Sequence, residues 1–245
     1  MNDKAAIRYA INKASKIINE SYEKYQVPVS LQANATPTDL TMQMVATING
    51  LNGKDVLVVA NYDTAVLLAA LKVMYAKQNL GNDYNFKSLT LLTDIVEIDP
   101  RFEDKFEVVL ANLNEPAKID MMGKKFDVVI GNPPYSEGLN RDGKEWSKED
   151  RTKPLFEKFV YWANDNLAED GNVAMVIPSK WTNNNQSSFT KWIVNKSGLR
   201  IVNNASQYFP NVKIPICWFM MDKAYTDKVV RVNGAATEVD TFIPV

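Results

Sequence analysis

Residues 126–135 read FDVVIGNPPY, an apolar run that ends abruptly in an amide, two prolines and an aromatic ring. The run over residues 126–131 has the length and the β-branched content of a buried strand. Two consecutive prolines cannot continue such a strand, because each lacks the backbone N–H that a sheet requires. The sequence therefore predicts a strand over residues 126–131 whose carboxyl end presents Asn132 and Tyr135.

Asn132, Pro133, Pro134 and Tyr135 together suit the binding of a flat molecule that carries an exocyclic NH2 group. The lone pair of such an amine is delocalised into its ring, so the nitrogen is a poor nucleophile. If the side-chain oxygen of Asn132 and the carbonyl of Pro133 both accept from the NH2 group, the charge that develops during attack is stabilised. The prolines hold this carbonyl rigidly, and Tyr135 offers a stacking face worth about 1–3 kcal/mol per base.

A long polar stretch, residues 136–153, follows this motif and contains Gly138 and Gly143. A binding tip followed by a polar loop is typical of α/β enzymes, whose sites lie outside the carboxyl ends of parallel strands. The alternative interpretation is an ordinary strand-ending turn with Tyr135 in the core.

Composition limits the possible functions. The chain has 245 residues, of which 46% are hydrophobic, enough for one large domain with its own core. It has no histidine, which excludes Ser-His-Asp and Cys-His catalysis and imidazole metal sites, and we expect no metal. The single cysteine, Cys217, lies in an apolar run and favours a core position over a nucleophilic one. No apolar stretch of about 18 residues and no secretory signal pattern are found, so we expect no membrane contact and a cytoplasmic location.

The distribution of charge is more informative than its sum, a net charge of −1. Between Gly171 and Met221 the sequence contains no Asp or Glu. The same stretch includes Trp181, Trp192 and a run of amides at residues 183–186. This combination is typical of a strip that binds phosphates and bases, although a solvated helix face is the alternative. The five basic residues of the stretch are Lys180, Lys191, Lys196, Arg200 and Lys213.

Apolar periodicity predicts alternating strands and helices, which indicates a mainly parallel sheet covered on both faces. The hydroxyl residues and the proline of Thr36-Pro37-Thr38 mark a helix start. The sequence also predicts a helix start at Asp99-Pro100. The predicted helices are 3–25, 40–48, 63–77, 99–113, 154–167 and 186–196, and the predicted strands are 55–60, 89–98, 126–131, 172–177, 200–202 and 214–221, with a hairpin at 229–243.

The chain resembles the S-adenosylmethionine-dependent N6-adenine DNA methyltransferases of the gamma type. The Asn132–Tyr135 motif is similar to their catalytic motif, and Thr36-Pro37 is similar to the start of the helix that precedes their cofactor elements. The segment VEIDP at residues 96–100 resembles their second-strand acidic motif. Downstream, VIPSKW at residues 176–181 resembles the Pro-x-x-Trp segment, and FPNV at residues 209–212 stands where the family places an aromatic against the target base.

The resemblance implies a three-layer, doubly wound α/β fold of the class I methyltransferase type, with seven strands of which one is antiparallel. It implies a flipped adenine held by Asn132, Pro133 and Tyr135, with Lys180, Trp181 and Phe209 as further substrate contacts. It also implies that Glu97 accepts from the ribose hydroxyls of the cofactor, with Asp94 as the competing candidate. The implied cofactor is S-adenosylmethionine, and its expected contacts are Thr36, Pro37, Ala60, Asn61, Asp63, Asp94 and Glu97.

One segment departs from the family pattern. The loop after the first predicted strand reads ANYDTA at residues 60–65, and no glycine occurs between Gly53 and Gly81. Glycines normally let the backbone pass close to the methionine part of the donor, and side chains such as Tyr62 occupy that space here. Donor binding that is weak, altered or lost is therefore an open alternative, although Asn61 and Asp63 offer polar contacts for an amino-acid moiety.

The expected organisation is an N-terminal helical extension over residues 1–34, a methyltransferase-like domain over 35–223 and a tail or hairpin over 224–245, without a separate target-recognition domain. The first functional hypothesis is a DNA adenine-N6 methyltransferase of a restriction-modification type that flips its base. The second is an inactive relative that binds DNA or a protein. The third is a methyltransferase for an RNA base or a glutamine amide. DNA is the expected partner, with sequence choice supplied by the chain's own loops, a specificity partner or a homodimer.

Overall fold

The computed structural model of this protein describes Glu20 and residues 36–48, 51, 53–59, 87–94, 107–135, 154–183, 187–196 and 198–238. The predicted helix over 63–77 lies outside these residues, and of the predicted helix over 3–25 only Glu20 is described. Among the described residues, no helix combines the length and the apolar character needed to cross a bilayer.

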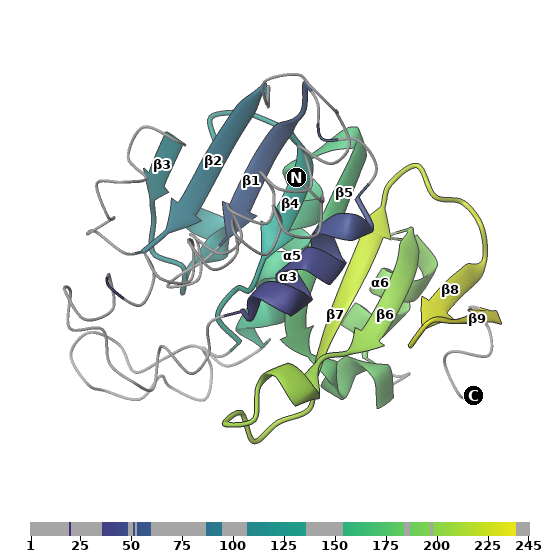
Figure 1. The fold of residues 1–245 in the computed structure, drawn as a ribbon. Helices are drawn as coiled ribbons and strands as arrows, with labels where there is room; N and C mark the ends of the chain where they lie inside the picture. The colour runs from purple at the N-terminus through teal and green to yellow at the C-terminus, as the bar shows by residue number, and fades with distance from the viewer. Residues whose placement is uncertain are drawn as a thin grey trace, which may run out of the picture.

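One twisted sheet organises the chain, and its strands follow the order β3-β2-β1-β4-β5-β7-β6-β8-β9 (Figure 1). Strands β1 to β5 are mutually parallel, and β7 runs antiparallel between β5 and β6. The class I fold predicted from the resemblance is thus confirmed, including its single antiparallel strand among the first seven. The strands are β1 (Asp55–Val59), β2 (Ser88–Thr93), β3 (Glu107–Leu110), β4 (Phe126–Gly131), β5 (Leu167–Pro178), β6 (Leu199–Asn204), β7 (Ile216–Asp222), β8 (Val229–Val232) and β9 (Ala235–Glu238).

The sheet has nine strands rather than the predicted seven. The additional pair is the hairpin β8–β9, whose first strand pairs in parallel with β6 through Ile201↔Arg231 and Val202↔Val232. The predicted hairpin exists, but it extends the main sheet instead of forming a separate tail.

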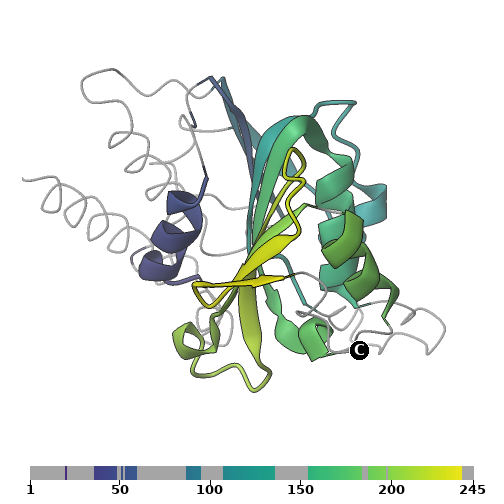
Figure 2. The same ribbon diagram turned by 90° about the vertical axis from the view of Figure 1, so that its right-hand side faces the viewer.

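Helices cover both faces of this sheet and make the three layers that Figure 2 shows edge-on. Helix α3 (Thr38–Ala46) packs on one face, where Leu40, Met44 and Val45 are completely buried. Helices α5 (Leu155–Asp165) and α6 (Ser188–Lys196) cover the other face. We call the core under α3 the α3-side core and the core under α5 and α6 the α5-side core.

Two elements differ from the predictions, and the cause in both is strand pairing. The predicted strand over 89–98 ends at Thr93, because β1 ends at Val59 and its last partner in β2 is Leu92. The predicted helix over 99–113 is wrong in its second half, where Glu107–Leu110 form strand β3 and pair with β2. The predicted strand was too long because Ile95, Val96 and Ile98 continue the apolar sequence pattern past Thr93.

The start of α3 also differs from the prediction of a hydroxyl cap. Pro37 occupies the N-cap position, and the cap makes no side-chain hydrogen bond. The carbonyl of Pro37 instead accepts from both the backbone N–H and the hydroxyl of Thr41, at 3.0 and 3.2 Å. The proline therefore starts the helix through its fixed φ.

A polar cluster fastens the amino ends of three strands together. The Asp55 carboxylate accepts from Lys87 Nζ and Ser88 Oγ, both at 2.6 Å, and Asp127 Oδ2 accepts from the backbone N–H of Asp55 at 2.8 Å. Burial alone would raise the pKa of Asp55, but the hydrogen bonds from Lys87 and Ser88 bring it below the ordinary value. The two aspartates at this edge are thus paired with lysines, Asp55 with Lys87 and Asp127 with Lys54.

Candidate active site

The backbone of strand β4 places Asn132 at the carboxyl edge, near the middle of the sheet. The strand has the predicted bounds, Phe126–Gly131, and lies between β1 and β5. Its last residue, Gly131, pairs with Val59, the last residue of β1. The backbone N–H of Asn132 then donates to the Val59 carbonyl at 3.1 Å, so the asparagine is held by main-chain bonding as it leaves the sheet.

Gly131 is a positioning residue that the sequence reasoning overlooked. A Cβ atom at this position would lie 2.0 Å from the Val59 carbonyl oxygen and 2.8 Å from its carbon, far inside van der Waals contact. Only glycine permits β1 and β4 to approach so closely at this point. A glycine inside a strand indicates such close backbone approach, and this signal was available in the sequence.

The side chains of the motif contact one another. The hydroxyl of Tyr135 donates to the side-chain oxygen of Asn132 at 2.7 Å. Tyr135 is half-buried and packs against both the α3-side and the α5-side cores, while Pro133 is buried. The contact orients the amide through a side chain that is itself anchored by the core. An amide oxygen has two lone pairs, so it can accept a second hydrogen bond from a bound amine.

The donor side of the predicted site is described only in part. Thr36 is buried and Pro37 is half-buried at the start of α3. This helix contacts the carboxyl edge through a hydrogen bond from Gln43 Nε2 to the Tyr208 hydroxyl. Asp94 is exposed directly after the end of β2, the neighbour of β1. The other predicted cofactor contacts, Ala60, Asn61, Asp63 and Glu97, lie outside the described residues.

The three predicted substrate contacts divide into one exposed and two buried residues. Lys180 is exposed on the short helix η3 (Ser179–Asn183), which follows β5 at the carboxyl edge. Trp181 is 2% exposed and meets the Phe189 ring edge-on at 6.1 Å, inside the α5-side core. Phe209 is likewise 2% exposed, inside the α3-side core. Both rings thus pack in the cores beneath the loops of the carboxyl edge, and their contact with a substrate stays a prediction.

The basic strip predicted between residues 171 and 221 does not form one surface. Arg200 lies at the amino end of β6, pairs with Asp222 at 3.0 Å and stacks over Tyr225. Lys191 is exposed on α6, outside the sheet. Among the basic residues of the strip whose side chains the structure describes, Lys180 on η3 and Lys213 on the loop before β7 lie at the carboxyl edge, and both are exposed.

The single cysteine has the core role that the sequence predicted. Cys217 is 2% exposed, and burial raises the pKa of its thiol to about 12. The thiolate that a nucleophile requires is therefore negligible at neutral pH. Within the described ranges, no three side chains of His, Cys, Asp or Glu gather as ligands for a metal ion.

Comparison with known proteins agrees with this geometry. Over residues 54–209, more than half of the chain, the sequence matches the family described as Eco57I restriction-modification methylase. An uncharacterized adenine-specific methylase of Mycoplasma pneumoniae is 33% identical over 132 residues, which cover 48% of this chain and 29% of that protein. This chain therefore spans less than a third of the length of that relative.

Solved structures share the fold at low sequence identity. A modification subunit of a putative type I restriction enzyme from Vibrio vulnificus superposes with a TM-score of 0.58 and 12% identity, over 80% of this chain and 46% of that one. A putative class I S-adenosylmethionine-dependent methyltransferase from Listeria monocytogenes gives a TM-score of 0.61 and 10% identity, over 94% of this chain and 74% of that one.

Proposed function

The chain belongs to the Eco57I restriction-modification methylase family, and from this premise we propose that it transfers a methyl group from S-adenosylmethionine to the N6 amine of adenine in DNA. The observation that carries the proposal is the Asn132 side-chain oxygen, held at the carboxyl end of β4 by the bond from Tyr135. The adenine specificity named for the Mycoplasma relative supports the same substrate.

Asn132 and Pro133 act on the amine. Each of the two N–H bonds of N6 is assigned one acceptor, the side-chain oxygen Oδ1 of Asn132 and the carbonyl oxygen of Pro133. With both N–H bonds held, the nitrogen lone pair is directed out of the ring plane, and the positive charge that develops on nitrogen faces two oxygens that are already in place. As the new N–CH3 bond forms, the S–CH3 bond of the donor breaks and S-adenosylhomocysteine leaves. The methylated nitrogen is then cationic and acidic enough to lose its extra proton to water, so no strong base is needed, which agrees with a chain that has no histidine.

Tyr135 has two roles in this proposal. Its ring, half-buried against both cores, provides the surface on which the adenine stacks. Its hydroxyl fixes the rotamer of Asn132 through the 2.7 Å bond, so the amide oxygen faces the amine before the base arrives. Preorganisation of this kind avoids a reorientation cost at the moment of reaction.

The described residues fit a nucleoside-containing donor at the neighbouring strand tips. S-adenosylmethionine, when bound, supplies an electrophilic methyl group. Asp94 presents a carboxylate beside the ends of β1 and β2, and carboxylates at this place in doubly wound folds accept from ribose hydroxyls. Glu97 is favoured by the family resemblance, whereas the end of β2 at Thr93 favours Asp94.

We assign weaker than usual affinity to this donor site. The chain has no glycine from residue 54 to residue 80, the region that includes the end of β1 and the loop after it. The same observation supports a second candidate function, an inactive family member that binds DNA or a protein with the inherited scaffold. We assign recognition of the target DNA sequence to a partner chain or to regions beyond the described residues.

The test combines donor binding with methyl transfer. Calorimetric titration with S-adenosylmethionine is expected to give heat that saturates, and radiolabelled methyl incorporation is expected with unmethylated plasmid DNA. Asn132→Ala should abolish transfer and leave donor affinity unchanged, whereas Asn195→Ala, an exposed amide on α6 with a local bond to Lys191, should change neither.

Each other outcome points to a specific alternative. No heat at millimolar donor supports the inactive binding protein. Methyl incorporation into RNA or protein instead of DNA would indicate that the substrate is an RNA base or a glutamine amide. Full activity in Asn132→Ala removes the asparagine from the chemistry.

A further inference from the structure

A protruding loop lies beside the active site and is not used by the chemistry proposed above. We call residues 210–215, which read PNVKIP, the 210–215 tip. It connects η4 (Ser206–Tyr208) to β7, and its residues are exposed except for the half-buried Val212. Because β6 is parallel to β4 and β5, the loop that follows β6 projects from the same edge as Asn132.

Hydrogen bonds hold the base of the tip in place. The Ile216 carbonyl accepts from the backbone N–H of Ala205 at 2.9 Å, and the Ile216 N–H donates to Ser206 Oγ at 3.0 Å. On the other side, Ser179 of η3 donates its N–H to the Pro215 carbonyl at 2.9 Å. Phe209 and Val212 pack beneath the tip in the α3-side core. The tip is thus a supported projection.

The tip holds an apolar side chain out in solvent. Ile214 is 46% exposed, one of three large hydrophobic residues with high exposure in the described part of the chain. It stands between Lys213 and Pro215, both exposed. An aliphatic wedge next to a cation is the pattern of side chains that enter between base steps while the cation contacts a phosphate.

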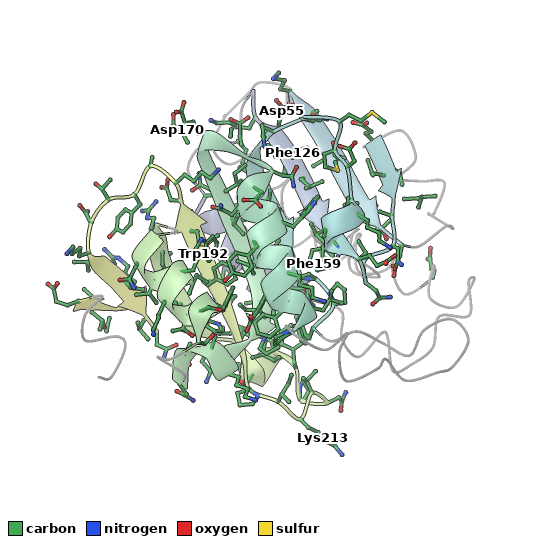
Figure 3. All side chains as sticks on the ribbon, turned by 180° about the vertical axis from the view of Figure 1, so that it is seen from behind. Asp55, Phe126, Phe159, Asp170, Trp192 and Lys213 are labelled. Atoms are coloured by element: carbon green, nitrogen blue, oxygen red, sulfur yellow. The ribbon has the colours of Figure 1, made fainter. Side chains whose placement is uncertain are left out.

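The charge around the 210–215 tip favours a polyanion at the carboxyl edge. Figure 3 shows Lys213 at the opposite end of the molecule from Asp55 and Asp170. The loops that follow β5 and β6 lie within the stretch from Gly171 to Met221, which has no acidic residue. Lys180 of η3, the element bonded to Pro215, is exposed as well.

We propose that the 210–215 tip enters duplex DNA beside the target adenine, with Lys213 on a backbone phosphate and Ile214 in the stacking space that the base leaves. This inference rests on the proposed function. Extruding a base from a duplex costs a few kcal/mol, and an apolar side chain in the vacated stack offsets part of that cost. Asn132 and Tyr135 then bind a base that is already extruded.

The experiment separates extrusion from chemistry. The methylated site is first mapped by sequencing plasmid DNA treated with the wild-type protein. Oligonucleotides with that site then carry the target adenine either paired with thymine or opposite an abasic position. Ile214→Ala is expected to lower the rate on the paired duplex about tenfold and on the abasic duplex less than about twofold, because the second substrate requires little unpairing.

Matched controls lie on the other edge of the sheet. Met122→Ala removes an apolar side chain that is 93% exposed before β4, and it should leave both rates unchanged. Lys213→Gln should weaken duplex binding and reduce the slope of log affinity against log salt by about one. Lys228→Gln, an exposed lysine before β8, should leave that slope unchanged.

Failure of this inference is distinguishable from failure of the proposed function. If the wild-type protein methylates DNA and Ile214→Ala matches it on the paired duplex, the tip is not a wedge, although the methyltransferase proposal stands. An equal loss on both duplexes also overturns the inference, because it indicates a role other than extrusion. If the wild-type protein methylates no site in plasmid DNA, the proposed function itself fails.

Discussion

Replacing Gly131 with alanine tests whether the close approach of β1 and β4 positions Asn132 for the proposed methyl transfer. The added Cβ atom would lie 2.0 Å from the Val59 carbonyl oxygen, and real contacts of this kind are at least 3.0 Å. The two backbones must therefore separate by about 1 Å, since neither atom belongs to a flexible side chain. The bond from the Asn132 N–H to the same oxygen, 3.1 Å in the native protein, cannot survive that separation.

The expected effects follow from this displacement. Overpacking and the lost backbone bond together should lower the free energy of unfolding by about 2–4 kcal/mol. That is a large share of a typical total of about 5–15 kcal/mol. Methyl transfer per folded molecule should fall about 100-fold, since a 1 Å misplacement of a catalytic group has effects of that order. Urea unfolding measures the first quantity, and initial rates below the unfolding transition measure the second.

Gly198 provides the matched control. A Cβ atom there would also lie 2.0 Å from a backbone oxygen, that of Asp222, but at the amino end of β6, on the edge away from the site. Gly198→Ala should lose comparable stability, with an added penalty for its φ of +69°, and keep its turnover. Wild-type stability and turnover in Gly131→Ala would refute the reasoning, as would equal losses of turnover in both variants.

Four further predictions concern single side chains. Tyr135→Phe keeps the ring and removes the hydroxyl that orients the catalytic amide, so kcat should fall about tenfold with little change in KM for DNA. Glu97→Gln should weaken donor binding about tenfold by calorimetry; an effect of that size in Asp94→Asn instead would assign the ribose contact to the end of β2. Asp55→Asn should lower the free energy of unfolding by about 1–3 kcal/mol at neutral pH. Because the folded pKa of Asp55 is lowered, this stabilisation is present above about pH 4 and lost as the pH falls through the folded value, so urea melts of the two proteins should converge in acid. Cys217, with a pKa of about 12, should resist thiol reagents at pH 8 until urea unfolds the protein.

The parts of the fold that were predicted correctly are those with local signals. Strand β4 has the predicted bounds because an apolar run meets Asn-Pro-Pro, which stops pairing within the local sequence. Helix α5 was predicted nearly to its ends for a similar reason, since a proline precedes it and its apolar face repeats at helical spacing. No information from distant segments was needed for either element.

The errors occur where a distant partner sets the structure. The length of β2 is limited by β1, which ends at Val59, and nothing near residue 93 signals that limit. Strand β3 is short, Glu107–Leu110, and forms by pairing with the edge of β2. The helix-start signal at Asp99-Pro100 was stronger in the local sequence, so a helix was predicted there. The predicted substrate contacts of Trp181 and Phe209 stay open, because aromatic residues suit both base stacking and cores, and the structure places both rings in the cores.

In the Asn132–Tyr135 motif, the atoms that stabilise the fold also orient the amide of Asn132 for the proposed reaction. The Val59 carbonyl that ends the pairing of β1 with β4 also accepts from Asn132, and the Tyr135 ring that contacts both cores carries the hydroxyl that orients the amide. The backbone of Asn132 bonds to Val59 and its amide to Tyr135, so the direction of the amide depends on the spacing of two strands and on packing across both faces of the sheet. Variants that loosen these contacts should therefore lose turnover before they lose donor binding, because the donor contacts proposed above are assigned to the ends of β1 and β2 and do not include the Tyr135 ring.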